Sequence, residues 1–285
     1  MNNNFSFVFF GSSPISVTAL DALLKAGMTP KAVVTQIDRP QGRGLSLVAT
    51  PVKIWAEDKR IPVEFFDADK ETFLKHLATY EADVFVLVSY GRMLPDEVLN
   101  MPRKGVVNLH PSLLPKLRGP SPIESSILLD MKNETGVSIM LLTQKMDEGP
   151  ILAQKQIEIP NWPPKRSDLY KILSEEGGNL LAQTLPLWVE GKIEPLEQDH
   201  ALSTYSKMIE KEDAEINLDG DPYKNYLKIQ AYEGRPGAFF FKEHAGKKIR
   251  VKITDASFEN NELHILKVIP EGKKEMTFGD FNRGF

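Results

Sequence analysis

An amide and an imidazole stand two residues apart at the end of an apolar run, and a carboxylate follows downstream. Asn108 and His110 close the run 105–110, and Pro111 ends it because proline has no N–H to donate. Side chains alternate along a strand, so Asn108 and His110 face the same side. Both can stabilise an oxyanion, and Asp147 can orient the imidazole or accept a proton. The set predicts acyl-group chemistry, without a serine or cysteine nucleophile if an amine substrate attacks.

Each residue alone has a more ordinary interpretation. An Asn-x-His triplet more often satisfies backbone groups at a strand end, and an aspartate such as Asp147 is a common turn residue. The combination with the proline-punctuated segment 112–119 is far more specific than either part. We therefore retain Asn108, His110 and Asp147 as the candidate catalytic residues.

The first half of the chain alternates predicted strands and helices. Ser13-Pro14 and Thr50-Pro51 have the cap-then-proline pattern that begins a helix. Apolar runs predict strands, and apolar residues at helical spacing predict a further helix over 70–80. The predicted strands are 5–10, 31–35, 62–66, 84–88 and 105–110. This rhythm predicts an α/β, Rossmann-like, mostly parallel sheet with helices on both faces, whose ligands bind beyond the carboxyl ends of the strands.

The second half has a different pattern. Strands are expected over 135–142 and 151–159, followed by a helix over 167–189 that Gly177-Gly178 interrupts. Short strands over 238–242, 248–255, 263–268 and 274–278 predict a small OB-like β-barrel. The predicted domains are a catalytic domain over 1–190, a linker over 191–206 and a shortened C-terminal barrel over 207–285.

Composition excludes several classes of protein. The chain of 285 residues has a net charge of −4 and no cysteine, which excludes disulfides, thiolate nucleophiles and cysteine-based zinc sites. It shows no signal peptide and no apolar run long enough to span a membrane. We expect a cytoplasmic monomer with no metal and no membrane partner.

Two segments resemble a known enzyme family. Residues 108–123 resemble the signature of the formyltransferases that use 10-formyltetrahydrofolate, and residues 135–152 resemble the catalytic-aspartate region of that family. The resemblance implies a folate formyl donor as substrate and no metal. It implies that Asn108 and His110 hold the formyl oxygen, and that Asp147 orients His110 and relays protons.

The resemblance also extends to the folate pocket. Residues 89–95 resemble a loop whose backbone lines that pocket in the family. The implied substrate-binding residues come from this loop and from the turn after His110. They are Ser89, Tyr90, Gly91, Arg92, Met93, Leu94, Ser112, Leu113, Leu114 and Pro115.

The acceptor is implied by a further segment. Residues 35–44 with 50–53 resemble the loop that, in methionyl-tRNA formyltransferases, enters the acceptor end of initiator tRNA. The implied reaction transfers the formyl group to the α-amine of methionine on that tRNA, for translation initiation. The candidate tRNA contacts are Arg39, Arg43 and Lys53, with Lys247, Lys248 and Arg250 on a basic strand near the C-terminus. Segment 201–285 has equal numbers of acidic and basic residues. Contact with tRNA would therefore depend on where individual cations lie and not on a positive electrostatic field of the whole segment.

Three alternatives stay open. The acceptor could be an amino sugar nucleotide, because the same three residues would serve that chemistry. Water could be the acceptor, which would make the chain a formyl-folate hydrolase. A nonenzymatic RNA-binding protein is the third, although the presence of Asn108, His110 and Asp147 argues against it.

Overall fold

The computed structural model describes residues 5–41, 46–66, 69–244 and 246–284. The chain forms two compact units. The first contains residues up to Arg118 together with Gly136–Ile157 and Lys171–Thr204, and the second contains Gly119–Thr135, Glu158–Tyr170 and the residues from Tyr205 onward. Two segments before residue 190 thus belong with the C-terminal residues. The functional division into catalytic domain, linker and tRNA-binding domain stays a prediction.

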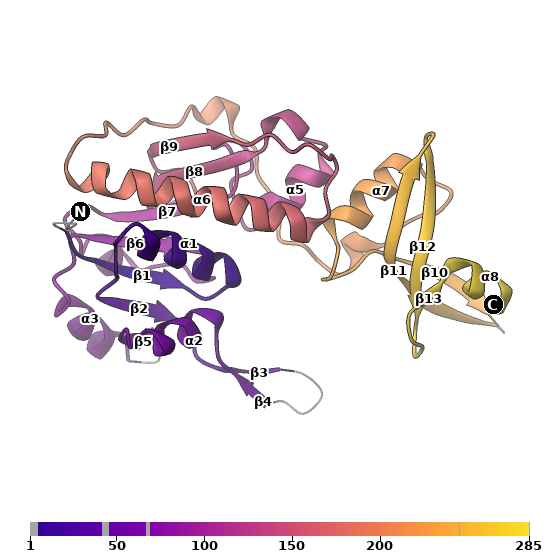
Figure 1. Cartoon of the computed structure of the whole chain (residues 1–285), viewed down its shortest axis with the longest axis horizontal. Coiled ribbons are helices and arrows are strands. Elements are labelled where there is room, and N and C mark those ends of the chain that lie inside the picture. Colours follow the sequence, from indigo (N-terminus) through magenta and orange to yellow (C-terminus); the bar gives the residue numbers. More distant parts are fainter. Residues whose placement is uncertain (1–4, 42–45, 67–68, 245, 285) are drawn as a thin grey trace. The chain divides into compact units, whose positions relative to one another are not determined.

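A seven-stranded sheet in the order β5-β2-β1-β6-β7-β8-β9 forms the first unit (Figure 1). Its strands are β1 (Phe7–Gly11), β2 (Ala32–Thr35), β5 (Val63–Phe65), β6 (Val84–Val88), β7 (Val106–His110), β8 (Gly136–Leu141) and β9 (Ile151–Gln156). The first five strands pair with one another in parallel. β8 is antiparallel to β7, and β9 is antiparallel to β8. The predicted mostly parallel sheet is confirmed.

Local sequence explains the first strand and the helices that follow. Every residue of β1 is buried, as expected for a continuous apolar run between two helical layers. Helix α1 (Pro14–Lys25) begins after Ser13, which forms a capping box with Ser16. Helix α2 (Pro51–Asp58) begins after Thr50, whose hydroxyl accepts from the backbone N–H of Lys53 at 3.1 Å.

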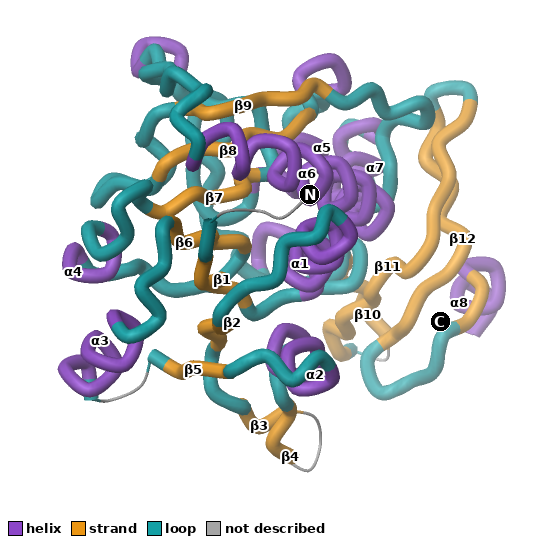
Figure 2. Tube along the Cα trace, turned by 60° about the vertical axis from the view of Figure 1, so that its left-hand side comes forward, coloured by secondary structure: helices purple, strands orange, loops and turns teal. Residues whose placement is uncertain are grey.

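Helices cover both faces of this sheet. Figure 2 shows α1, α2 and α6 (Arg166–Val189) on one side, and α3 (Lys70–Ala78) and α4 (Asp96–Leu99) on the other. Between β2 and α2, strands β3 (Arg39–Gln41) and β4 (Ser46–Val48) form a separate two-stranded antiparallel sheet that the sequence analysis did not predict. None of the helices described is both long enough and apolar enough to cross a bilayer.

The expected interruption of α6 at Gly177-Gly178 is wrong, because the helix runs through both residues. A Cβ on Gly177 would lie 2.9 Å from Leu109 Cδ1, and one on Gly178 would lie 3.1 Å from Ala22 Cβ. Both glycines therefore let the helix lie closely against β7 and α1. Close packing, and not a break in the helix, is the reason for glycine here.

The second unit contains a four-stranded antiparallel sheet in the order β10-β11-β12-β13. Its elements are α5 (Pro122–Leu128), α7 (Pro222–Ala231), β10 (Phe239–His244), β11 (Lys247–Glu259), β12 (Glu262–Pro270), β13 (Met276–Thr277) and α8 (Phe278–Gly284). No pairing of β10 with β13, which would close a barrel, is found in the described chain. The predicted strand 274–278 is only two residues long, and its last residue begins α8 instead.

Candidate active site

The carboxyl ends of three parallel strands meet at one edge of the first unit's sheet. The chain passes from β1 outward to β2 and β5, and then returns to add β6 and β7 on the other side of β1. The strand order therefore reverses beside β1, where doubly wound sheets bind their ligands. Gly11, Val88 and His110 end the three strands at this edge.

Asn108 and His110 lie on β7, as predicted. Asn108 is paired with Leu87 of β6 and Met140 of β8, and His110 is paired with Ser138. Asn108 is only 6% exposed and His110 only 5%. A buried amide and a buried imidazole interact with a polarised substrate more strongly than they would in water, because the surrounding dielectric is low.

The imidazole of His110 lies between a backbone carbonyl and the Asp147 carboxylate. Its Nε2 is 2.9 Å from the oxygen of Leu117, and its Nδ1 is 3.8 Å from Oδ2 of Asp147. A carbonyl only accepts, so Nε2 carries the hydrogen and donates it. The separation from Asp147 is within ion-pair range but is longer than a hydrogen bond. The structure thus brings His110 and Asp147 together and directs Nδ1 toward the carboxylate.

The turn that carries Asp147 has a constrained backbone. Asp147 has φ of 54°, which is the left-handed region that side chains other than glycine rarely adopt. A Cβ on Gly149 would lie 1.9 Å from the carbonyl oxygen of Leu141, so only glycine fits that position. The turn therefore lies directly against the end of β8, and its position fixes where the carboxylate stands.

The predicted substrate-binding loop 89–94 follows β6 at the same edge of the sheet. The backbone carbonyl of Tyr90 accepts from Gln36 Nε2 at 2.7 Å and from the Ser12 hydroxyl at 3.3 Å. Ser89 and Gly91 have φ of 48° and 80°, and a Cβ on Gly91 would lie 2.7 Å from Gln36 Nε2. Residues that directly follow β1 and β2 thus hold the backbone of this loop.

Side chains of the loop lie in different environments. The Tyr90 ring is 1% exposed and packs edge-on against Phe10, with centroids 5.7 Å apart. Burial raises the pKa of the Tyr90 phenol to about 12. Ser89, Arg92 and Met93 are exposed, whereas Leu94 is half-buried. The side chain of Tyr90 therefore packs in the core, and its carbonyl anchors the loop by accepting hydrogen bonds.

The predicted substrate-binding turn 112–115 is held by hydrogen bonds with side chains of β8 and β9. Ser138 donates to the carbonyl of Ser112 at 2.6 Å and accepts from the N–H of Leu114 at 3.1 Å. Gln154 donates to the Leu114 carbonyl at 2.8 Å. Ser112 and Leu114 are buried, and Leu113 and Pro115 are half-buried. Whether these residues contact a substrate stays a prediction.

The predicted tRNA contacts of the first unit differ in availability. Arg39 is exposed on β3. Lys53 forms an ion pair of 2.7 Å with Asp38, and this hydrogen bond raises the pKa of the lysine. Arg43 lies outside the described residues. Of the two described cations, Lys53 already has an internal partner.

In the second unit, the predicted basic strand combines cations with aromatic rings. The Lys248 ammonium lies 4.2 Å from the ring centroid of Phe241, and the Arg250 guanidinium lies 3.8 Å from that of Phe239. Lys247 is exposed on the same strand. Cations placed on aromatic rings are a common arrangement in nucleic-acid-binding surfaces.

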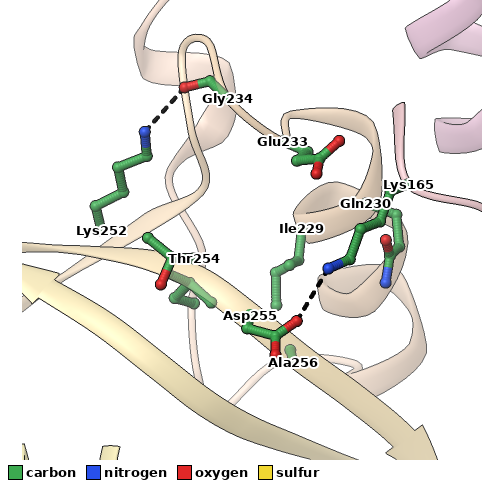
Figure 3. Close-up of a pocket in the computed structure, with 10 residues that line it drawn as sticks. Lys165, Ile229, Gln230, Glu233, Gly234, Lys252, Thr254, Asp255 and Ala256 are labelled. Carbon is green, nitrogen blue, oxygen red and sulfur yellow. Dashed lines mark hydrogen bonds and ion pairs between the residues drawn. The ribbon is translucent and has the colours of Figure 1, made fainter. Parts of the chain in front are cut away.

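A cavity of about 230 Å³ lies in the second unit, and part of its lining comes from β11, which also carries the predicted tRNA contact Arg250 (Figure 3). Lys165 lines it and pairs with Asp255 at 3.1 Å, and Lys252 donates to the carbonyl of Gly234 at 2.9 Å. Glu233 adds a second carboxylate. Two lysines and two carboxylates balance, so the lining favours neither an anion nor a cation. Throughout the described residues, no group of three potential metal ligands is present.

Sequence reasoning missed the residues that support the Asp147 turn. Arg118 is 1% exposed, and Gln198, although it lies in the predicted linker, is 5% exposed. Gln198 contacts the backbone of the Asp147 turn, and Thr204 contacts that of Leu117. A polar stretch without periodicity gives no signal for such long-range contacts. Arg118 lies within the segment 112–119, but its contact with Gln198 was not predicted.

Comparisons with known proteins identify the family of the chain. The family described as "Formyl transferase" matches residues 4–185. A methionyl-tRNA formyltransferase of Thermotoga maritima is 40% identical over 82% of the chain and 74% of its own length, and that of Halalkalibacterium halodurans is 35% identical over 97% and 94%.

Solved structures share the fold at low sequence identity. A sugar N-formyltransferase from a Shewanella species is 17% identical with a TM-score of 0.65, over 90% of this chain and 99% of its own. A methionyl-tRNA formyltransferase from Clostridium thermocellum is 14% identical with a TM-score of 0.60, over 96% and 99%. Identities this low show a shared fold only. The relatives with 35–40% identity show the family. The chain belongs to the formyl transferase family, and within it to the methionyl-tRNA formyltransferases.

Proposed function

We propose that this chain transfers the formyl group of 10-formyltetrahydrofolate to the α-amine of methionine on initiator tRNA. The observation that carries the proposal is the placement of His110, which lies between the Leu117 carbonyl and Asp147, two residues from Asn108 on a buried strand end. Family membership supplies the substrate class. The buried donors supply the chemistry that acyl transfer to an amine requires.

The reaction forms one C–N bond and breaks another. The amine nitrogen of methionine attacks the formyl carbon, and the formyl oxygen takes the negative charge of the tetrahedral intermediate. The side-chain amide of Asn108 donates to that oxygen, and an imidazolium at His110 donates from Nδ1. Collapse of the intermediate breaks the bond between the formyl carbon and the folate nitrogen.

One proton must travel from the attacking amine to the leaving nitrogen. Nε2 of His110 is occupied by the Leu117 carbonyl, so Nδ1 is the ring nitrogen open to exchange. Asp147 faces Nδ1 and can accept the proton lost by the amine, directly or through water, and that proton then passes to the folate nitrogen as it leaves. The 3.8 Å separation allows the contact to tighten once substrates bind, as is common for catalytic hydrogen bonds.

For the tRNA we propose contacts on each unit. Arg39 is exposed on the first unit, and Lys248 and Arg250 lie on aromatic rings of the second. Lys53 stays in the proposed set, and its ion pair with Asp38 also ties α2 to the segment before β3. The exposed Lys247 and, from the sequence alone, Arg43 complete the predicted set.

The proposal is tested by release of tetrahydrofolate from 10-formyltetrahydrofolate under four acceptor conditions. These are methionyl initiator tRNA, methionyl elongator tRNA, an amino sugar nucleotide and no acceptor. We expect release with the initiator tRNA, and the His110→Ala variant is the control for background hydrolysis. Release with the sugar nucleotide in place of the tRNA would overturn the acceptor, and equal release with no acceptor would indicate a hydrolase.

A further inference from the structure

One segment of the first unit, residues 198–204, contacts the backbone on both sides of His110. We propose that this segment, named here the strap, is a positioning element that sets the catalytic geometry of the His110–Asp147 pair. The inference rests on the proposed function, since it needs a reaction in which the pair takes part. The strap was predicted to be a linker, and nothing in its sequence suggested contact with the site.

Gln198 begins the strap and holds the Asp147 turn. Its Nε2 donates to the carbonyl of Asp147 at 2.8 Å and to that of Gly149 at 2.7 Å. Gln198 is 5% exposed, so these bonds are sheltered from competition with water. The side chain thus binds the catalytic residue's own peptide group.

Arg118 fixes which way the Gln198 amide points. Its Nε and Nη2 lie 3.1 and 2.7 Å from Oε1 of Gln198. A guanidinium has no acceptor, so the amide oxygen must face it and the NH₂ group must face the turn. Arg118 also lies 3.7 Å from a carboxylate oxygen of Glu148, the residue after Asp147. Arg118, a buried cation, therefore orients the Gln198 amide and also contacts the turn to which that amide donates.

Thr204 ends the strap on the other side of the imidazole. Its hydroxyl accepts from the N–H of Leu117 at 2.9 Å, and its carbonyl accepts from the N–H of Arg118 at 2.9 Å. Leu117 supplies the carbonyl to which His110 donates. The strap thus holds Leu117, whose carbonyl fixes the imidazole ring, and Asp147, which the ring faces.

Both supported residues have a left-handed backbone. Leu117 has φ of 56° and Asp147 has φ of 54°. Residues with a Cβ persist in this region only where their surroundings determine the conformation. Hydrogen bonds from the strap supply that constraint at both places. Without them, each turn is free to relax and to move its group away from His110.

Loss of one strap contact should lower turnover and leave substrate binding unchanged. We expect Gln198→Leu to lower kcat by roughly a hundredfold, the scale of a displacement of about 1 Å in a catalytic group. The KM values for both substrates should stay within about twofold, because the strap acts through Asp147 and Leu117. Thr204→Val is nearly isosteric and should lower kcat by about tenfold, whereas Thr204→Ser keeps the hydroxyl and should restore it.

A double-mutant cycle with Asp147→Asn separates positioning from general destabilisation. If Gln198 acts through the Asp147 carboxylate, Gln198→Leu should lower kcat by less than about twofold in the Asp147→Asn background. Glu197, an exposed residue directly before the strap, provides the control, and Glu197→Gln should keep wild-type kcat.

The outcomes are distinct. An inactive wild-type chain would overturn the proposed function. An active wild type with unchanged kcat in Gln198→Leu, or with the full loss retained in the Asp147→Asn background, would overturn the positioning role. If Gln198→Leu does not fold, the Thr204 pair decides, since equal kcat for Thr204→Val and Thr204→Ser would overturn the role as well.

Discussion

The Nε2 atom of His110 donates to the backbone carbonyl of Leu117 at 2.9 Å, and this bond decides which ring nitrogen serves the reaction. With Nε2 occupied, Nδ1 is directed toward Asp147. The tautomer is thus set by the main chain, and the carboxylate meets a nitrogen that can gain or lose a proton.

Removing the amide of Asn108 should lower turnover strongly. Loss of one oxyanion donor costs roughly 3–4 kcal/mol, so Asn108→Ala should reduce kcat by a factor of about 100–1,000. Steady-state kinetics with the formyl donor and methionyl-tRNA would measure it, and circular dichroism would verify the fold. A kcat within about twofold of wild type would remove Asn108 from the mechanism.

Adding one methyl group to the Asp147 turn should lower both stability and activity. In Gly149→Ala the new Cβ would meet the carbonyl oxygen of Leu141, so the turn must move. Overpacking of this kind costs roughly 1–3 kcal/mol of the free energy of unfolding, and kcat should fall with it.

Gly279 provides the matched control for that variant. A Cβ at this position of α8 meets only Thr277 Oγ1 at 3.9 Å. Gly279→Ala should therefore leave the urea midpoint and kcat unchanged. A Gly149→Ala variant that behaves like Gly279→Ala would show that the turn tolerates displacement.

Tyr90→Phe should raise the free energy of unfolding. The Tyr90 hydroxyl is buried, and no hydrogen-bond partner for it is found among the described residues. Removing an unsatisfied buried hydroxyl and keeping the ring should stabilise the chain by about 1 kcal/mol, as measured by urea unfolding. The KM for the folate substrate should not change, because the ring of Tyr90 lies in the core and only its backbone belongs to the predicted binding loop. A higher KM would place the hydroxyl in the substrate site.

Asp83 should stabilise the fold at neutral pH and lose this effect in acid. Its carboxylate accepts from the backbone N–H of Ser6 at 2.8 Å, and that bond, with help from Arg103, holds its pKa below the ordinary 3.8. A lowered pKa stabilises the folded state above the unfolded-state value, and the effect disappears as pH falls through the folded-state pKa.

Asp83→Asn should thus be less stable than wild type at pH 7 by about 1 kcal/mol. Urea unfolding at several pH values should show the two proteins converging as the carboxylate is protonated. A difference that stays constant down to strongly acidic pH would mean that packing, and not charge, explains it.

Much of the fold follows from local patterns. Continuous apolar runs marked the buried strands, and Ser13-Pro14 and Thr50-Pro51 marked two helix starts, because caps and periodicity act within a few residues. The break predicted at Gly177-Gly178 is wrong, since close packing against β7 leaves no local sign in the sequence.

The candidate site divides along the same line. Asn108 and His110 were placed by strand alternation alone, and Asp147 by the turn that follows β8. The contact of Gln198 with the Asp147 turn joins residues 51 positions apart in the chain. A polar residue in an irregular segment carries no local sign of such a partner. The supporting residues therefore became visible only in three dimensions.

The most direct test is formylation of methionyl initiator tRNA by the wild-type chain and by His110→Ala, read by mass spectrometry of the aminoacyl group. Folate binding is measured in parallel for both proteins. The proposed function predicts formyl-methionine with the wild type and a loss of orders of magnitude in the variant, with folate affinity retained. Equal formylation by both proteins, or none by the wild type, would contradict it.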